Sequence, residues 1–316
     1  MLELSGAPQG YTAADYARDQ DILYRWVRAN YPNCLLVGPC TTGGPAAAGP
    51  ESKGFGAGIA SMTKTCTTEE LLAGTQIPLD VFSYHYYNGV SERIAGVLPA
   101  AHWPSHLAHS DPYLAVAPDS ATAHAALRDR FVPGGQMWVT ESGDAGGGGD
   151  TWASTYLDVL RTLNELGSYA TITDGVIFHN TLASSDYGFL EHGTFLPRPN
   201  YFAALLWNRL MGSAVYDCRE LNRENVHVYC HSRKDGACGV VYLIINNSLT
   251  DAISVTIPQK ALRYTLHAQT MRSSAMLLNG KELTISGNCG LPELVPELQP
   301  QGTVSLAPSS CTFFSL

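Results

Sequence analysis

Apolar and polar positions follow two alternating periods over the first two thirds of the chain. Apolar residues at helical spacing predict helices over 12–30, 121–131, 151–166 and 201–211, the last ended by Gly212. Short apolar runs predict strands over 34–37, 79–87, 136–140 and 175–178. Strands that alternate with helices in this way are typical of βαβ units around a parallel sheet. We therefore expect an α/β fold up to residue 212.

The pattern changes after Gly212. Short strand-like runs broken by turns follow one another with no good helix between them, over 226–229, 239–245, 253–257, 264–268, 276–278 and 312–314. Such runs are typical of an antiparallel β-sandwich. The sequence thus predicts two domains, 1–212 and 213–316.

Composition narrows the possible partners. The chain has 316 residues, 45% of them hydrophobic, which is ample for a buried core. Its formal charge is −9, and its 19 Lys and Arg are scattered singly, so nucleic acid is a poor candidate partner. We expect neither a membrane anchor nor a secretion signal within the chain, because no apolar run reaches the roughly 18 to 20 residues of a membrane span.

The cysteines and a glycosylation sequon bear on the compartment. Eight cysteines form no CxxC pair, and no His accompanies them at zinc-finger spacing, so no metal site is expected. We expect disulfides among some of them instead. Together with the sequon Asn246-Asn247-Ser248, this favours the secretory pathway, with an extracellular or a lysosomal or vacuolar location.

Glu141 is the first candidate for chemistry. It follows the predicted strand 136–140 and precedes a glycine-rich turn, in the stretch WVTESGDAGGGG. Barrel enzymes place their reacting groups at this end of parallel strands. The alternative is an ordinary helix-capping or solvated Glu. The glycines, equally, form either a loose linker or a backbone whose N–H groups approach an anion.

A glycosidase needs a second carboxyl group on the other side of the scissile bond. The candidate is Glu3, in LELSG. If Leu2 and Glu3 end a strand, Glu141 ends the third strand after it. The alternative is a frayed surface residue near a chain end.

Four longer stretches resemble one enzyme family. WVTESGDAGGGG, SYHYYNG, SDYGFLEHGTFLPRPNYFAALLWNRLMG and MLLNGKEL are similar, in order, to stretches of the heparanase-like family, glycoside hydrolase family 79, and more to its plant members than to its animal ones. The resemblance implies a retaining β-glucuronidase or endo-β-glucuronidase. It also implies a fold in which this chain supplies strands 4 to 8 of a (β/α)8 barrel, followed by a β-sandwich.

The resemblance also implies roles for individual residues. Glu141 matches the nucleophile of the family and Glu3 its acid/base. Without the family, His85 would be read as a core histidine more readily than as a site residue. The residues implied to bind the substrate are Gly147, Gly148 and Tyr187, for the uronic carboxylate, and His85 and Tyr86, which line the sugar subsite.

The start of the chain departs from the family pattern. The family reads Gly-Asn-Glu at the acid/base, and plant members continue with Leu-Ser-Gly, whereas this chain has Met1 and Leu2 before Glu3. A second alignment register puts Ala7 at the acid/base position, and under it the protein is catalytically inactive. Contiguity of ELSG favours the first register.

The strands that precede strand 4 of the barrel are absent from this chain, so we expect a truncated product or a fragment completed by an N-terminal chain. No cofactor is expected. The expected substrate is a polysaccharide, proteoglycan or glycoside that contains glucuronic acid, and the acidic chain favours a glycan less charged than heparan sulfate. Two alternatives are an inactive carbohydrate-binding or regulatory relative, and a sandwich from about residue 213 that acts alone as a binding module.

Overall fold

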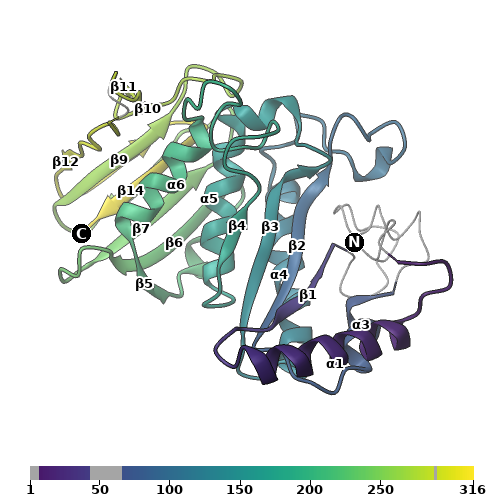
Figure 1. Ribbon diagram of the computed structural model, residues 1–316. Coiled ribbons are helices and arrows are strands. Elements are labelled where there is room, and N and C mark those ends of the chain that lie inside the picture. Colours follow the sequence, from purple (N-terminus) through teal and green to yellow (C-terminus); the bar gives the residue numbers. More distant parts are fainter. Residues whose placement is uncertain (1–6, 43–65, 288–289) are drawn as a thin grey trace. The chain divides into compact units, whose positions relative to one another are not determined.

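The computed structural model describes residues 7–42, 66–287 and 290–316 (Figure 1). The chain divides by its internal contacts into two compact units, which are described separately. The first unit comprises Met1–Trp103, Val116–Gly149 and Ile172–Asn180; the second comprises Pro104–Ala115, Asp150–Thr171 and Thr181–Leu316.

A parallel sheet forms the centre of the first unit. Its strands lie in chain order: β1 (Val37–Thr41), β2 (Val81–Val90), β3 (Gln136–Gly146) and β4 (Ile177–His179). This confirms the predicted α/β class. The expected strand 34–37 is wrong in its bounds, because the Leu36 N–H donates to the Asp80 carboxylate (2.7 Å) and the sheet pairing begins only at Val37.

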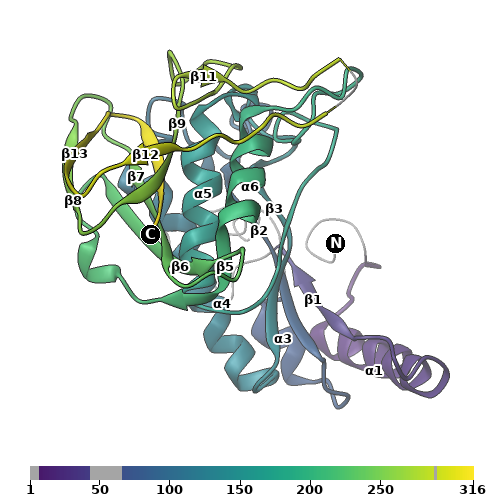
Figure 2. The same ribbon diagram turned by 90° about the vertical axis from the view of Figure 1, so that its left-hand side faces the viewer.

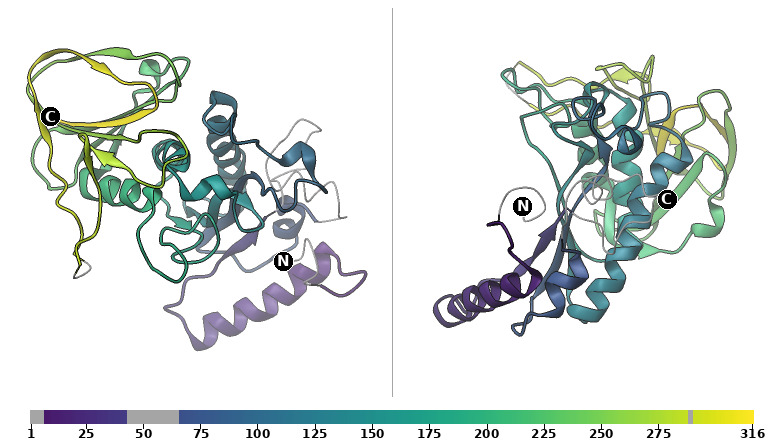
Figure 3. Two further views of the ribbon diagram at one scale, coloured as in Figure 1. Left: turned by 90° about the horizontal axis from the view of Figure 1, so that it is seen from above. Right: turned by 90° about the vertical axis from the view of Figure 1, so that its right-hand side faces the viewer.

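The described helices of this part are α1 (Ala13–Asn30), α3 (Thr68–Ala73) and most of α4 (Asp111–Phe131), whose residues up to Ala115 belong to the second unit; a 3-10 turn, η1, lies at Pro99–Ala101. Thr12 and Asp15 form a capping box that fixes the start of α1, as the sequence predicts. Both panels of Figure 3 show α1, in purple, beside β1. Helix α4 begins before the predicted residue 121 and runs through Pro118, where a proline normally argues against helix.

An eight-stranded antiparallel sheet forms the centre of the second unit, in the order β11-β10-β9-β14-β7-β6-β5, with β12 paired to β9. The predicted antiparallel class is thus observed, and a second layer of two strands, β8 and β13, accompanies the sheet. The strands are β5 (Met211–Tyr216), β6 (Val226–Arg233), β7 (Val240–Asn246), β8 (Ile253–Ile257), β9 (Ala261–His267), β10 (Leu277–Leu278), β11 (Lys281–Glu282), β12 (Glu297–Gln299), β13 (Gly302–Leu306) and β14 (Ser310–Ser315), with a 3-10 turn, η3, at Arg219–Leu221.

The two faces of the large sheet are covered differently. On one face, helices α5 (Leu157–Ala170) and α6 (Pro199–Leu210) pack against the sheet through a cluster that includes Leu160, Phe202 and Phe313. A 3-10 turn, η2 (Thr151–Ser154), precedes α5. On the other face, β8 and β13 close a smaller apolar cluster (Figure 2). The predicted boundary between 212 and 213 stays a prediction, but by contacts α5 and α6 belong with this sheet.

Gly212 stands at the predicted C′ position, because Met211 is the C-cap of helix α6. Helix α6 ends at Leu210, and Gly212 lies in β5. A Cβ at this position would come within 2.4 Å of the Ser232 hydroxyl and 2.6 Å of its carbonyl oxygen. The glycine is therefore required by the close approach of β5 and β6, which is a tertiary constraint.

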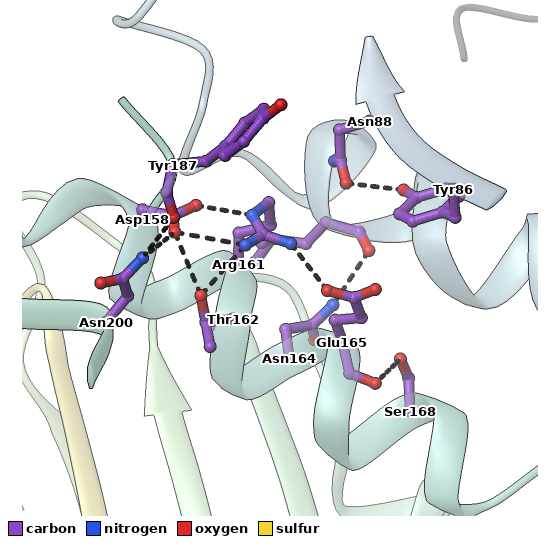
Figure 4. Close-up of polar contacts among 11 residues, drawn as sticks. Tyr86, Asn88, Asp158, Arg161, Thr162, Asn164, Glu165, Ser168, Tyr187 and Asn200 are labelled. Carbon is purple, nitrogen blue, oxygen red and sulfur yellow. Dashed lines mark hydrogen bonds and ion pairs between the residues drawn. The ribbon is translucent and has the colours of Figure 1, made fainter. Parts of the chain in front are cut away.

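Helix α5 carries a buried ionic network (Figure 4). The Arg161 guanidinium is 1% exposed and donates to Asp158 (2.6 and 3.2 Å) and to Glu165 (2.7 Å). Asn200, from α6, also donates to Asp158 (3.3 Å). Because each buried charge has partners of opposite sign, the helix can be buried although it is not apolar on all sides.

Two features from which the compartment was inferred, disulfides and an accessible sequon, are not seen among the described residues, and the secretory location itself stays a prediction. The seven described cysteines (34, 40, 66, 218, 230, 238 and 311) are all free thiols, and Cys289 lies outside the described residues. Asn246, the sequon asparagine, is fully buried and donates to the carbonyls of Asp251 (2.9 Å) and Ala307 (3.0 Å), so the folded chain offers no amide there for a glycan. Among the helices of the described part, none is long and apolar enough to cross a membrane.

Candidate active site

Glu141 lies in β3, at the carboxyl-terminal half of the parallel sheet, where two neighbouring strands supply its partners. The His85 ring, from β2, forms an ion pair with one carboxylate oxygen (Nδ1 to Oε2, 2.6 Å). The Asn180 amide, which follows β4, donates to the other oxygen (Nδ2 to Oε1, 2.6 Å) and to the Tyr87 hydroxyl (2.7 Å). The parallel order of the strands thus brings together side chains that are far apart in the sequence.

These contacts set the charge of the site. The bond from His85 is the main cause that lowers the pKa of Glu141; burial opposes it, and Tyr87 and Asn180 contribute in the same direction as His85. Burial would lower the pKa of His85, but Cys40 and Glu141 raise it to about 9. Near neutral pH the site therefore holds an ionised carboxylate beside a charged imidazole.

The tyrosine beside Glu141 is Tyr87, and the role expected for Tyr86 in lining the sugar subsite stays a prediction. Side chains alternate between the faces of a strand, so residues 85 and 87 of β2 share one face and residues 84 and 86 the other. Tyr86 is 6% exposed and its hydroxyl donates to the Asn88 side chain (2.6 Å; Figure 4). His85 contacts Glu141, and its expected role in lining the sugar subsite stays a prediction.

The glycine-rich turn after β3 has a backbone that only glycine adopts easily. Gly147, Gly148 and Gly149 have φ of 94°, 99° and 77°. A Cβ on Gly147 would come within 2.3 Å of the Ile94 Cδ1 atom. The Arg93 guanidinium donates to the Gly149 carbonyl (2.7 Å) and holds the end of the turn. The turn is therefore a built feature of the first unit and not a loose linker.

Cys40 is a further member of the Glu141 cluster. It lies at the end of β1, and its sulfur is 2.9 Å from the Ser83 hydroxyl oxygen. Burial would raise the pKa of the thiol, but interactions with His85, Ser83 and Thr140 lower it below its usual value. The cluster thus extends from Glu141 through His85 to a thiol.

Two other predicted site residues are not among the described members of the Glu141 cluster. Glu3 lies outside the described residues. Tyr187 belongs to the second unit, where its carbonyl accepts from Asn200 (3.2 Å). The roles expected for both stay predictions, as does the alternative register with Ala7.

Sequence reasoning missed Tyr87, Asn180 and Cys40. Each follows or ends a predicted strand, so the rule that parallel strands gather their carboxyl ends could have found all three. What the arrangement offers chemically is a carboxylate that stays ionised, is held by donors on both oxygens, and is 32% exposed at its side chain. Such a group suits nucleophilic attack or charge stabilisation better than proton donation.

Comparisons with known proteins point to glycoside hydrolases. No protein-family model matches the chain. The chain is 28% identical to heparanase-like protein 1 of Arabidopsis thaliana over 279 residues, which cover 75% of this chain and 50% of that protein. It is 31% identical to baicalin-beta-D-glucuronidase of Scutellaria baicalensis over 188 residues, 57% of this chain and 36% of that protein. The chain therefore spans half or less of the length of these relatives.

Solved structures show the fold. A 4-O-alpha-L-rhamnosyl-beta-D-glucuronidase from Fusarium oxysporum superposes with a TM-score of 0.64 at 15% identity, over 96% of this chain and 65% of that one. An alpha-L-arabinofuranosidase from Thermotoga maritima gives a TM-score of 0.61 at 14% identity, over 97% and 62%. At these identities the likeness shows a shared glycoside hydrolase fold, with a parallel α/β part and an antiparallel sheet.

Proposed function

Because the chain is a relative of the heparanase-like proteins of glycoside hydrolase family 79, we propose that it contributes the nucleophile half of a retaining β-glucuronidase. Its substrates are glycosides or glycans that carry β-linked glucuronic acid. Curated relatives include a baicalin-beta-D-glucuronidase and a hyaluronoglucuronidase, which supports this class of substrate.

One observation carries the proposal: Glu141 is kept ionised by partners on both oxygens. In a retaining mechanism an ionised carboxylate attacks the anomeric carbon while the bond from that carbon to the leaving oxygen breaks. His85 and Asn180 hold the carboxylate in one orientation, because each binds a different oxygen. The same donors stabilise the carboxylate when it leaves in the second step.

The acid/base of the proposed mechanism is Glu3. It gives its proton to the leaving oxygen and later takes one from the water that releases the sugar. We expect its carboxyl group roughly 5 to 5.5 Å from that of Glu141, the separation of retaining enzymes. If Ala7 holds this position instead, the chain binds the sugar but does not cleave it.

The glycine turn supports the choice of glucuronic acid. Backbone N–H groups at Gly147 and Gly148, where positive φ opens the chain, are suited to a carboxylate oxygen. We assign the uronic carboxylate to this turn. The expected location of the protein is the secretory pathway, where such glycans occur.

The parallel strands β1 to β4 correspond, in this proposal, to strands 5 to 8 of a (β/α)8 barrel. Among the described residues, β1 pairs only with β2 and β4 only with β3, so both edges of the parallel sheet are open. Open edges of a parallel sheet favour pairing with further strands. An N-terminal chain that supplies those strands is the proposed partner.

The test is hydrolysis of 4-nitrophenyl β-D-glucuronide by the chain, alone and with an N-terminal half barrel of a plant relative. Glu141→Gln is expected to lower kcat by at least about a thousandfold, since the nucleophile is lost. Glu282→Gln, on the exposed β11, is the matched control. Retention is read from the anomer first released, by proton NMR.

The outcomes separate the alternatives. Equal activity of wild type and Glu141→Gln would contradict the role of Glu141. Binding of glucuronic acid by calorimetry without hydrolysis in either mixture would favour the inactive carbohydrate-binding relative. Loss of activity in Glu3→Gln as well would establish the acid/base.

A further inference from the structure

Cys40 occupies an irregular position in β1. Pro39 pairs with Ser83 and Thr41 with Tyr84, so Cys40 is an extra residue in the ladder. Its φ is +56°, in the left-handed region that a residue with a side chain seldom adopts. This backbone directs the sulfur toward the Ser83 hydroxyl, 2.9 Å away.

The same face of β2 carries His85. Ser83 and His85 are two residues apart on β2 and therefore point to the same side of the sheet. The thiol interacts with both of them, and the imidazole Nδ1 lies 2.6 Å from the Glu141 carboxylate. Three strands thus place a thiol, an imidazole and a carboxylate in a row, in the order of a Cys-His-acid constellation.

We propose that Cys40, within the Cys40-His85-Glu141 row, is a site of covalent modification by small, uncharged, soft electrophiles. The carboxylate stabilises the protonated imidazole, and the protonated imidazole stabilises the thiolate. The thiolate is the reactive form of cysteine. Cys40 is partly exposed, so a small reagent has access to it.

The surroundings of Cys40 differ from those of other cysteines in the described part of the chain. Burial raises the pKa of Cys66, Cys218, Cys230 and Cys311, which disfavours their thiolates. From α1, Tyr16 and Tyr24 also face Cys40, but burial raises the pKa of both, so they remain neutral phenols near neutral pH. His85 and Glu141 are therefore the charged groups that act on the thiol.

The chemical step is a displacement. With iodoacetamide, the thiolate sulfur attacks the methylene carbon, a sulfur–carbon bond forms, the carbon–iodine bond breaks, and iodide leaves. The attacking species is the thiolate, which has already lost its proton, so iodide is the only leaving group. The product is a thioether, and no oxidant or further reactant is needed.

Modification of Cys40 should also affect the proposed glucuronidase activity. A carbamidomethyl group on the sulfur lies beside His85 and removes the thiolate from the row. We therefore expect modified protein to lose glucuronidase activity. This arm rests on the proposed function, whereas the reactivity of the thiol does not.

The experiment measures alkylation of the intact chain by iodoacetamide at each cysteine, by peptide mapping and mass spectrometry, from pH 5.5 to 9. Exposed Cys34 and Cys238 are internal references in the same sample. We expect the ratio of the Cys40 rate to the reference rates to be larger at pH 6 than at pH 9, because His85 favours the thiolate of Cys40 at the lower pH. In His85→Gln the Cys40 profile should become like those of the references.

Two further samples complete the design. In Cys40→Ser, whatever activity remains should be indifferent to iodoacetamide, while wild type is inactivated in step with labelling at Cys40. Cys34→Ser should change neither labelling at Cys40 nor inactivation. A wild-type Cys40 rate that follows pH as Cys34 and Cys238 do would overturn the proposal, even if His85→Gln failed to fold. Because labelling needs no turnover, an inactive chain would count against the proposed function and leave this test intact.

Discussion

Glu141 shows how much a single residue depends on its neighbours in space. Its oxygens contact His85 and Asn180, which come from different strands, and Tyr87 completes the network through Asn180. A hydrogen bond to a charged group is worth about 1.5 to 3 kcal/mol, roughly twice one between neutral groups. Hydrogen bonds to charged groups therefore contribute most to holding these side chains together.

Substitution of the adjacent tyrosines Tyr87 and Tyr86 should have different effects on catalysis. Tyr87→Phe should lower kcat/KM by about tenfold or more, because the hydroxyl that orders Asn180 and Glu141 is lost. Tyr86→Phe, the matched control, should lower the free energy of unfolding by about 1 kcal/mol and leave kcat/KM within about twofold. Steady-state kinetics and urea unfolding of both variants check this. The reverse pattern would show that the alternation of β2 has been assigned wrongly.

His124 should make the stability of the chain sensitive to acid. It stacks on Tyr84 (3.8 Å between ring centroids), and burial lowers its pKa to about 4. The folded pKa is below the usual value near 6.5, so the unfolded chain binds the proton first as pH falls. Stability should therefore decline from about pH 6.5 downward, by on the order of 3 kcal/mol in total near pH 4.

The measurement is urea unfolding at pH 7, 5.5 and 4.5. His124→Phe retains the stacked ring but cannot be protonated, so its stability should fall less than that of wild type over this range. His192→Gln, on an exposed loop, is the control. Equal decline in wild type and His124→Phe would refute the assignment.

At the scale of single residues, the sequence predicted side-chain contacts only within long stretches similar to a known family. Glu141 and His85 lie in stretches similar to a known family, and the structure brings them together. The position of Asn180 after the predicted strand 175–178 indicated the right edge of the sheet, but only the pairing of β3 with β4 brings it to Glu141. Tyr87, on the same face of β2 as His85, was not selected from the sequence.

Among the elements, α5 differs most from an ordinary amphipathic helix. Its Arg161–Asp158 pair and the exposed Arg18–Asp15 pair on α1 have the same spacing of three residues. The side chains of the first pair are 1% and 0% exposed, and those of the second 58% and 31%. The two pairs therefore isolate the effect of burial.

Arg161→Met should lower the free energy of unfolding by about 3 to 5 kcal/mol, because Asp158 and Glu165 are then buried without their counter-charge. Arg18→Met should change it by no more than about 1 kcal/mol. Chemical denaturation at pH 7 measures both. Similar small effects would mean that water reaches Arg161 in solution.

Element type was easier to predict than element bounds. The capping box of Thr12 fixed the start of α1, since both partners are close in sequence. In contrast, α4 continues through Pro118, and Gly212, although it follows the cap of α6 as predicted, is required by a strand contact. Both features depend on residues that are distant in the sequence, so the local sequence pattern does not reveal them.

At the scale of the whole chain, the helices of the second unit determine which fragments can fold alone. A fragment of residues 213–316 lacks α5 and α6, so Leu243, Ile245 and Phe313 lose their apolar cover. We expect this fragment to aggregate or to give poorly dispersed NMR spectra. A fragment of residues 150–316, which retains both helices, is the matched control and should show greater dispersion. A cooperative, monomeric 213–316 fragment would contradict the packing described and support a separate binding module.

The division of the chain into interleaved segments limits what genetic recombination can exchange. The chain passes between the two units at 103/104, 115/116, 149/150, 171/172 and 180/181. The Glu141 cluster draws on all three segments of the first unit, with His85 in the first, Glu141 in the second and Asn180 in the third. No single recombination point can therefore exchange one unit for that of another gene. A crossover at any of the first four points would divide the cluster, whereas one at 180/181 would leave it whole and exchange only part of the second unit.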